Sequence, residues 1–433
     1  MASKNRIGSI LIIVVIIAIV VAIATWVFFM PKTQMLEYRV YDSLRYQKPI
    51  FDVDTITDVE YGKVRGYWTS SDYDYDVGSI LKGHVRTLQT DSLNLLMDIY
   101  LPKDDTLIRR PLVMLIHGGA FYVGCKNDLP MQTWCSHYAS LGYVAVSIDY
   151  RMGFQPTKRS IERAGYAAVQ DAHAAMRYLV ENQSVYGIDT SMMFVGGTSA
   201  GAITALHLAY MTKATRPVTS YEGDFWDTDM GDIESSGNSI DKTFTMKGVV
   251  DMWGAVYDIN MIDSKKIPVV AFHGNLDDVV PYDYDYPFAE IGSEWKRKLL
   301  FDKMYGSSMI IERLLRNGVD KSMLYTLYNK AHSPYIDSDG DLNDVFYYIQ
   351  DRMDMFLCDI TTDIDIVANG CNYCLNNRYA TDVTWRVDGG NIKKNSDSSI
   401  NVEWLRDAPE HNVYASGKIR GTGFVRKLNV VDN

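Results

Sequence analysis

Two short runs of apolar residues constrain the fold of this chain more than any other feature. Residues 112–116 read LVMLI and residues 143–148 read YVAVSI, so neither run alternates apolar with polar positions. Strands that are buried on both faces show this pattern, whereas a strand with one solvated face alternates. We therefore expect a parallel sheet that is covered on both sides.

Further strand-like and helical segments alternate along the chain. Predicted strands include residues 95–100, 192–195, 248–252, 269–272 and 322–328, and predicted helices include residues 164–181, 200–211, 298–317 and 342–357. This alternation predicts an α/β fold with a mostly parallel central sheet and helices on both faces, which we assign to residues 58–358. An acidic insertion at residues 214–243 interrupts the alternation, and its composition fits a lid, a pocket wall or a surface loop.

The C-terminal residues have a different pattern. Residues 383–387 (VTWRV), 400–404 (INVEW) and 412–415 alternate apolar and polar positions between turn-forming residues, without a helical period. This pattern predicts a small all-β module at residues 359–433, with a β-sandwich-like arrangement.

The N-terminal residues 7–30 carry no charged side chain, and Lys4 and Arg6 precede them. About 20 apolar residues suffice to cross a bilayer as a helix, so we expect a transmembrane anchor, with residues 31–57 as a stalk and the large C-terminal body outside the cytoplasm. A cleaved signal peptide is the alternative, because Ala22-Ile23-Ala24 has the form of a cleavage site. The apolar run continues beyond that point as TWVFFM, which favours the anchor.

Charge and cysteine content exclude some functions. The net charge of -11 argues against nucleic-acid binding, which needs clustered Lys and Arg. The five cysteines include one CxxC pair, Cys371 and Cys374, without a second pair or a histidine pair nearby. We therefore expect no zinc site or other metal, and we expect disulfides or inert thiols for Cys125, Cys135, Cys358, Cys371 and Cys374.

Ser199 lies in the sequence GTSAG, residues 197–201, between a predicted strand and a predicted helix. An abrupt strand-to-helix turn forces the serine into strained backbone angles, and only small residues two positions away avoid collision. A capping or turn-closing serine would be the simpler interpretation of the pentapeptide alone. The surrounding strand and helix favour an exposed nucleophile.

A serine hydroxyl becomes a nucleophile when a base accepts its proton and a carboxylate orients the base. Asp277 and Asp278 follow the predicted strand at 269–272, and His332 follows the strand at 322–328. The order Ser, Asp, His is the one that an open α/β sheet with a GxSxG turn requires. Of the other histidines, His84 and His411 lack this context, whereas His173 and His207 lie in predicted helices and are expected to be structural.

Residues 117–120 read HGGA and directly follow the strand at 112–116. Glycine amides can approach a substrate closely, so this segment can donate hydrogen bonds to a negatively charged reaction intermediate. A tight turn would be the alternative in the absence of Ser199.

The motifs LLMDIYLP, RPLVMLIHGGAFYVG, GYVAVSIDYR, FVGGTSAGA and PVVAFHGNLDDVVPY together resemble those of the α/β-hydrolase carboxylesterases with an HGG oxyanion loop. The resemblance covers about residues 58–357. It implies Ser199 as nucleophile, His332 as base and Asp277 as orienting acid, since the family acid stands three residues after the glycine of the HG pair. It also implies oxyanion donors at the amides of Gly118, Gly119 and Ala200, and no cofactor.

Two features depart from the family pattern. The loop reads HGGA where many members have a third glycine, and Ser333-Pro334 rather than a glycine follows His332. The C-terminal module is weakly similar to PKD-like and other immunoglobulin-like β-sandwiches.

The sequence therefore predicts a membrane-anchored serine carboxylesterase that acts on a small-molecule or carbohydrate-linked ester. A serine peptidase of the same fold and a catalytically inactive binding protein are the alternatives. Tyrosines and acidic residues at 282–288 (YDYDYPF) are candidates for a pocket wall.

Overall fold

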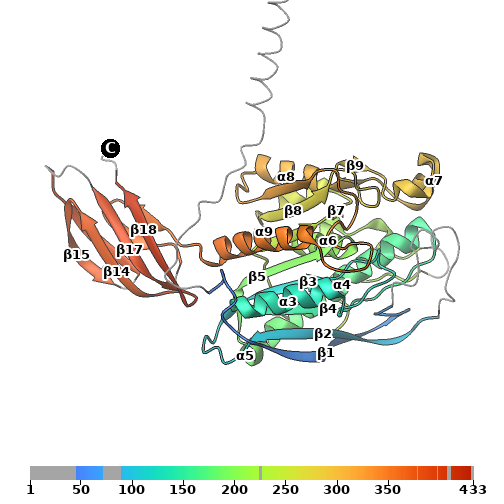
Figure 1. Ribbon diagram of the computed structural model, residues 1–433, viewed down its shortest axis with the longest axis horizontal. Helices are drawn as coiled ribbons and strands as arrows, with labels where there is room; N and C mark the ends of the chain where they lie inside the picture. The colour runs from blue at the N-terminus through green and yellow to red at the C-terminus, as the bar shows by residue number, and fades with distance from the viewer. Residues whose placement is uncertain are drawn as a thin grey trace, which may run out of the picture. The chain divides into compact units, whose positions relative to one another are not determined.

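The apolar runs form the centre of the structure, a computed structural model that describes residues 45–71, 89–223, 227–377, 379–396, 398–406 and 411–430 (Figure 1). Strand β3 (Arg110–Ile116) pairs in parallel with β4 (Val144–Ile148). Every residue of β4, and every residue of β3 after Arg110, is buried. The absence of alternation thus corresponds to burial on both faces.

The central sheet has eight strands in the order β1-β2-β4-β3-β5-β6-β8-β11. Pairing is antiparallel between β1 and β2 and between β2 and β4, and parallel from β4 onward. The other strands are β1 (Val53–Gly66), β2 (Asp91–Pro102), β5 (Ile188–Thr198), β6 (Gly248–Met252), β8 (Val269–Gly274) and β11 (Met323–Leu327). This mixed, mostly parallel sheet confirms the predicted α/β fold class.

Helices cover both faces of the sheet, as predicted. Along β3, Met114 and Ile116 belong to one apolar cluster, whereas Val113 and Leu115 belong to another. The first cluster includes residues of α4 (Lys158–Glu181), α6 (Ala200–Tyr210) and α8 (Ser307–Arg316). The second includes residues of α3 (Leu129–Leu141) and α9 (Asp344–Thr361).

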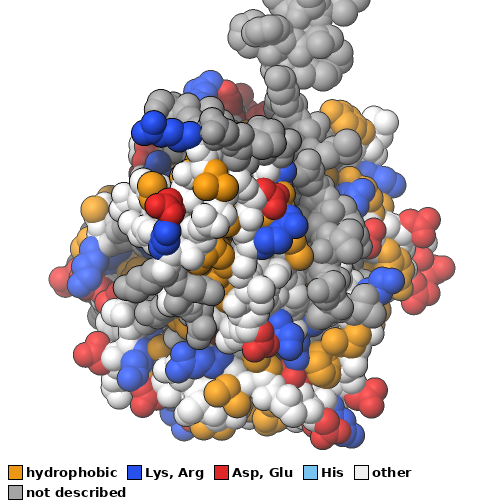
Figure 2. Space-filling view, turned by 90° about the vertical axis from the view of Figure 1, so that its left-hand side faces the viewer, with side chains coloured by type: hydrophobic (Ala, Val, Ile, Leu, Met, Phe, Trp, Pro, Cys, Tyr) orange, Lys and Arg blue, Asp and Glu red, His pale blue; other side chains and the backbone are white. Residues whose placement is uncertain are grey.

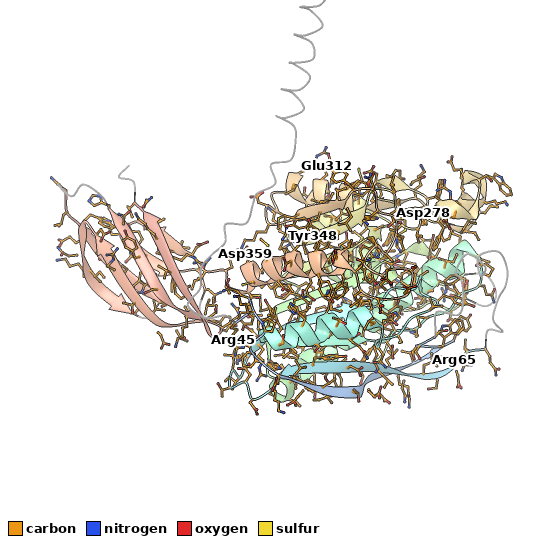
Figure 3. All side chains as sticks on the ribbon, in the orientation of Figure 1. Arg45, Arg65, Asp278, Glu312, Tyr348 and Asp359 are labelled. Atoms are coloured by element: carbon orange, nitrogen blue, oxygen red, sulfur yellow. The ribbon has the colours of Figure 1, made fainter. Side chains whose placement is uncertain are left out.

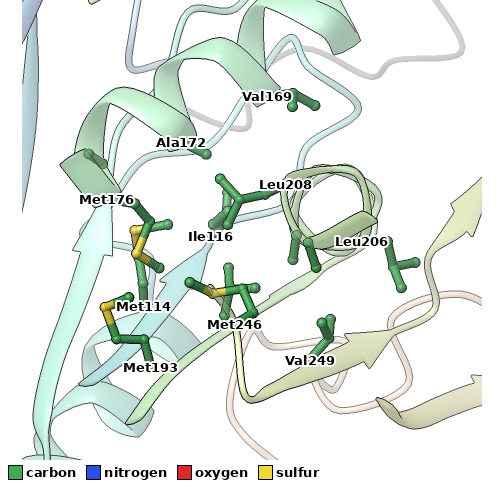
Figure 4. Close-up of a cluster of buried hydrophobic side chains, with 14 of the residues drawn as sticks. Met114, Ile116, Val169, Ala172, Met176, Met193, Leu206, Leu208, Met246 and Val249 are labelled. Atoms are coloured by element: carbon green, nitrogen blue, oxygen red, sulfur yellow. The ribbon is translucent and has the colours of Figure 1, made fainter. Parts of the chain in front are cut away.

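The first cluster is rich in methionine (Figure 4). Met114, Met176, Met193 and Met246 lie among branched aliphatic and alanine side chains of α4, α6 and the sheet. Flexible thioether side chains fill irregular gaps, so they suit the space where small-residue helices meet a twisted sheet.

Two elements differ from the sequence prediction. Strand β1 begins at Val53, within the residues assigned to the stalk, and pairs with β2 along most of its length. The single helix predicted at 298–317 is wrong, because α7 (Glu294–Leu300) and α8 are separated by β10 (Met304–Gly306). At Gly306, the residue before α8, a Cβ atom would lie 1.9 Å from the carbonyl oxygen of Pro281, so this close approach requires glycine.

The C-terminal residues form strands around their own apolar cluster, which includes Tyr373, Trp385 and Val413. One sheet has the order β12-β13-β16-β15 and the other β14-β17-β18. Their bounds are β12 (Ile366–Asn369), β13 (Asn372–Leu375), β14 (Ala380–Asp388), β15 (Gly390–Ser396), β16 (Ser399–Trp404), β17 (Asn412–Ile419) and β18 (Thr422–Asn429). The predicted all-β character is confirmed, whereas the PKD-like resemblance stays a prediction.

The predicted anchor at residues 1–30, and most of the predicted stalk, lie outside the described residues. None of the helices that the structure describes is long and apolar enough to span a bilayer. On the face shown in Figure 2, Lys and Arg side chains are interspersed with Asp and Glu side chains. All five cysteine thiols are free, with Cys135 and Cys358 buried and Cys371 and Cys374 exposed.

The start of helix α6 packs directly on the end of β3. A Cβ atom at Gly201 would lie 2.0 Å from the carbonyl oxygen of Ile116, and one at Gly197 would lie 2.5 Å from the same oxygen. Because backbone atoms are the obstacle, no side-chain rearrangement would relieve the collision. The small residues of GTSAG therefore permit this helix to approach the sheet.

The buried ammonium group of Lys126 anchors the segment that follows β3. The Lys126 ammonium lies 2.8 Å from Asp98 Oδ1 and 2.9 Å from Asp58 Oδ1, and its backbone N–H donates to Asp149 Oδ1 at 2.7 Å. Burial raises the pKa of Asp149 to about 7, despite the hydrogen bond from Lys126.

The Gly201→Ala substitution should lower the free energy of unfolding by about 2 kcal/mol or more, because the added methyl group meets a backbone oxygen. Gly165→Ala on α4 is the matched control, since a Cβ atom there meets only the Phe121 ring at 3.7 Å. We expect the control to be neutral or stabilising by up to about 1 kcal/mol, the usual helical preference for alanine. Urea denaturation measures both, and equal stabilities would contradict the packing argument.

Asp149 should make stability depend on pH. A carboxyl whose pKa is higher in the folded state than its unfolded value of about 3.9 takes up a proton on folding. Its contribution is therefore present below about pH 4 and is lost as the pH rises to about 7, by on the order of 1–4 kcal/mol. Urea denaturation at pH 5 and pH 8 should show that wild type loses free energy of unfolding as the pH rises, and that Asp149→Asn loses less. Asp104→Asn, at an exposed position, is the control and should lose as much as wild type. If the free energy of unfolding of Asp149→Asn fell as much between pH 5 and pH 8 as that of wild type, this assignment would be contradicted.

Candidate active site

Ser199 lies at the turn between β5 and α6, with φ 53° and ψ −118°. Such angles are strained for a residue with a side chain. Its backbone N–H donates to the carbonyl of Met252 at 2.9 Å, which continues the β5–β6 pairing to the serine itself. The side chain is thus held at the carboxyl edge of the parallel strands, where open α/β sheets bind their ligands.

The structure brings Ser199, His332 and Asp277 together. His332 Nε2 lies 2.9 Å from Ser199 Oγ, and His332 Nδ1 lies 2.8 Å from Asp277 Oδ2. The imidazole can therefore accept the hydroxyl proton at one nitrogen while its other N–H donates to the carboxylate. This arrangement can activate a hydroxyl as a nucleophile.

Paired loops after β8 and β11 set the positions of Asp277 and His332. The two strands are parallel neighbours, so their loops emerge side by side. The backbone N–H of Leu276 donates to the carbonyl of Lys330 at 3.0 Å, and the N–H of Asn329 donates to Asn275 Oδ1 at 2.6 Å. These hydrogen bonds hold the two loops together just before Asp277 and His332, so the two side chains stay close to each other.

The His332 ring also packs against aromatic side chains. Its centroid lies 6.3 Å from that of Trp253, with an edge-to-face angle of 71°, and Trp253 stacks on Tyr335 at 4.9 Å. Trp253 follows β6, the strand between those that carry Ser199 and Asp277. These contacts restrict rotation of the imidazole.

The side chain of Asp277 is completely buried and accepts several hydrogen bonds. Its Oδ1 accepts from the backbone N–H groups of Val279 and Val280, each at 2.9 Å. Burial alone would raise the pKa of this carboxyl, but His273 and His332 at Oδ2 outweigh burial and hold the pKa well below its usual range. Asp277 is therefore an anion at neutral pH.

The neighbouring Asp278, labelled in Figure 3, follows the carboxyl end of β8, as Asp277 does. It is only partly buried, and its backbone carbonyl accepts the N–H of Ala289 at 2.5 Å. The hydrogen bond to the His332 ring belongs to Asp277.

The HGGA segment lies beside the serine. A Cβ atom at Gly118 would lie 3.4 Å from Ser199 Cβ and 3.0 Å from the carbonyl oxygen of Thr198, so this residue borders the nucleophile. Gly119 has φ +99°, and Ala120 has φ +52°. The alanine thus keeps the left-handed conformation that a third glycine would adopt more easily.

The hydroxyl of Tyr150 holds this loop, because it lies 3.0 Å from the carbonyl of His117 and 3.1 Å from that of Gly118. Ala200, the first residue of α6, offers a backbone N–H that has no intrahelical partner. The three predicted oxyanion donors, Gly118, Gly119 and Ala200, therefore belong to segments that border Ser199.

A cavity of about 680 Å³ opens beside Ser199. Its walls are mainly apolar and aromatic. Residues of α4 and α6 contribute, together with Pro217, Val218 and Thr219 of the 214–243 insertion and Tyr284, Tyr286 and Phe288 of the tyrosine-rich segment. The insertion is thus partly a pocket wall.

The helical histidines are buried. Burial lowers the pKa of His173 to about 3 and that of His207 to about 4, so both are neutral at physiological pH. His207 Nδ1 donates to the carbonyl of Ile203 at 2.7 Å. Its ring stacks on Tyr257 and lines the cavity, so it contributes to the wall as well as to helix packing. His84 lies outside the described residues.

Four residues near the site were not identified from the sequence: Tyr150, Trp253, Asp251 and Ser307. In the sequence, His273 was considered only as the histidine of the HG pair that marks the position of Asp277. One signal was available, because Asp251 is a carboxylate within the otherwise apolar strand GVVDM. The contacts of the others depend on distant segments.

Comparisons with known proteins find esterases. Residues 97–259, less than half of the chain, match the family model BD-FAE. Gut esterase 1 of Caenorhabditis briggsae is 29% identical over 100 residues, which are 23% of this chain and 18% of that protein. Carboxylesterase NlhH of Mycobacterium tuberculosis is 26% identical over 172 residues, which are 39% of this chain and 51% of that protein.

Among solved structures, Thermogutta terrifontis esterase 2 phosphorylated by paraoxon aligns with a TM-score of 0.44 and 19% identity, covering 62% of this chain and 90% of that one. The chain spans about half or less of the length of the curated relatives named above.

Proposed function

We propose that this chain is a serine carboxylesterase. The observation that carries the proposal is the hydrogen-bonded series Ser199–His332–Asp277, at 2.9 and 2.8 Å, beside a large apolar cavity. The esterase names of its relatives support ester hydrolysis. The substrate is a small-molecule or carbohydrate-linked ester with an apolar portion that fits the cavity.

The reaction begins when Ser199 Oγ attacks the ester carbonyl carbon and its proton passes to His332 Nε2. The Asp277 carboxylate accepts the Nδ1–H and stabilises the imidazolium that forms. The carbonyl oxygen becomes negatively charged and receives hydrogen bonds from the amides of Gly118, Gly119 and Ala200. Each such donor is worth roughly 3 kcal/mol of barrier.

The tetrahedral intermediate then collapses, and the bond between the carbonyl carbon and the alcohol oxygen breaks. His332 gives its proton to the departing alcohol, which leaves an acyl group on Ser199. A water molecule attacks this acyl-enzyme with His332 again as base, and the carboxylic acid and the free serine are regenerated.

The triad prediction compares neighbouring aspartates. Asp277→Asn should lower kcat on p-nitrophenyl butyrate by about 10⁴-fold, because an amide cannot hold the imidazole in the required tautomer. Asp278→Asn is the matched control and should stay within about threefold of wild type, since its side chain does not hold His332. Equal losses would overturn the assignment of the acid.

Ser199→Ala should lose activity by about 10⁶-fold and fail to react with a fluorophosphonate probe. A matched butyryl amide separates esterase from peptidase: wild type should hydrolyse the ester faster than the amide. Wild-type activity in Ser199→Ala would exclude the proposed nucleophile, and preference for the amide would favour a peptidase.

The cavity should set the preference for the length of the substrate. Ile203 lies one helical turn after Ser199 and lines the cavity, so Ile203→Trp should fill the space next to the nucleophile. We expect selectivity for octanoyl over acetyl esters, or for octyl over ethyl esters, to fall by about tenfold or more. Val218→Trp at the exposed part of the wall is the control and should leave both ratios unchanged. Unchanged ratios in a folded, active Ile203→Trp protein would show that the substrate lies elsewhere.

A further inference from the structure

A second histidine contacts the carboxylate of Asp277. His273, near the end of β8, is completely buried, and its Nε2 lies 3.2 Å from Asp277 Oδ2. The same oxygen receives His332 Nδ1 at 2.8 Å. One carboxylate oxygen therefore lies between two imidazoles, of which only His332 reaches Ser199.

The hydrogen bonds continue beyond His273. Its Nδ1 lies 2.7 Å from the hydroxyl of Ser307, the first residue of α8, and that hydroxyl lies 2.7 Å from Asp251 Oδ2 on β6. Asp251 Oδ1 accepts the backbone N–H of Gly254 at 2.8 Å. The side chains of Asp277, His273, Ser307 and Asp251 are fully buried, so this part of the series is shielded from water.

The donors and acceptors fix where protons can lie. His273 Nε2 faces two acceptors, Asp277 Oδ2 and the carbonyl oxygen of Val280 at 3.1 Å, so this nitrogen carries a proton. The Ser307 hydroxyl has a single proton but contacts both His273 Nδ1 and Asp251 Oδ2. If Ser307 donates to Asp251, then Nδ1 is protonated and His273 is a cation. If Ser307 donates to Nδ1, then Asp251 carries the proton.

In either arrangement His273 and Asp251 together are electrically neutral. An imidazolium with a carboxylate and a neutral imidazole with a carboxylic acid have the same total charge. Burial of one unpaired charge is costly, whereas a neutral pair with satisfied hydrogen bonds is tolerated. The pair thus gives Asp277 an additional N–H donor without adding net charge to the site.

We propose that His273 is a positioning residue for Asp277, and that Ser307 and Asp251 orient its ring so that the Nε2–H points at the triad carboxylate. This role of His273 rests on the proposed esterase function, in which His332 is the base. The titratable side chains that the structure places against His273 are Asp277, Asp251 and Tyr282, whose ring meets it edge-on at 5.6 Å.

The donor from His273 affects the acid side of the pH profile. It draws part of the negative charge of Asp277 away from His332. Loss of the donor leaves more charge facing His332 and favours its imidazolium form. If His332 stays protonated up to a higher pH, it can act as a base only above that pH. The acid limb of the kcat/KM profile therefore moves to higher pH.

The test compares His273→Phe with His273→Gln. Phe keeps an aromatic ring of similar size but has no N–H, whereas the Gln amide can donate to Asp277 and accept from Ser307. We expect His273→Phe to lose about tenfold or more in kcat and to shift the acid limb upward by about 0.5 pH or more. His273→Gln should stay within about threefold and shift by about 0.2 pH or less. If His273 served only to fill space, Phe would be the better replacement, and that order would overturn the proposal.

A second pair of variants, at Ser307, tests the proposal if His273→Phe folds poorly. Ser307→Ala removes the bridging hydroxyl and should shift the profile in the same direction, whereas Ser307→Thr keeps the hydroxyl and should not. An NMR titration of the His332 ring in the same variants needs no substrate, and its midpoint should move in the same order. If wild type hydrolyses no ester, the proposed function fails while this titration still decides the role of His273. Identical midpoints across the variants would overturn that role.

Discussion

The site depends on backbone hydrogen bonds that continue past the ends of four parallel strands. Pairing between β5 and β6 extends to Ser199, whose N–H donates to Met252, and pairing between β6 and β8 extends to Trp253, whose N–H donates to Phe272 at 2.7 Å. The loops after β8 and β11 are joined in the same way through Leu276 and Lys330. Because each bond fixes one strand end against the next, the separation of Ser199, His332 and Asp277 follows from the register of the sheet.

This convergence has a cost in backbone strain. Ala120, Phe121, Ser199, Trp253 and Ser333 all have positive φ, and each follows a strand end or adjoins His332. Such residues cost of order 1–3 kcal/mol each and persist only where their surroundings fix them. Here the surroundings are the close approach of α6 to β3 through Gly197 and Gly201, the tyrosine hydroxyl beneath HGGA, and the aromatic stack on Trp253. The strain and the contacts that oppose it lie at the same edge of the sheet.

The sequence predicted the parts of this arrangement that are encoded locally. Buried parallel strands appear as unbroken apolar runs, and GTSAG, HGGA and the residues after β8 and β11 stand directly at strand ends. Strand β1 was not predicted, because most of its residues are exposed at the edge of the sheet and carry little apolar pattern. The break between α7 and α8 contains β10, whose Gly306 passes close to Pro281, and this contact is not visible in the local sequence. Likewise, Asp251, His273 and Ser307 are separated by 22 to 56 residues, so their series of hydrogen bonds exists only after folding.

Two groups of buried polar side chains occur where direction matters more than contact area. One, built on Lys126, Asp98 and Asp149, holds the segment that follows β3 and begins with HGGA. The other, built on Asp277, His273 and Asp251, lies under the triad. Apolar packing is non-directional, so it can bury an imidazole but cannot choose which nitrogen faces a carboxylate. Hydrogen bonds of fixed length can make that choice, although burial of the groups reduces stability unless every one is paired. The methionine-rich cluster beneath α4 and α6 can therefore remain adaptable, because the orientation of the reacting groups is set by these polar series and by the strand ends.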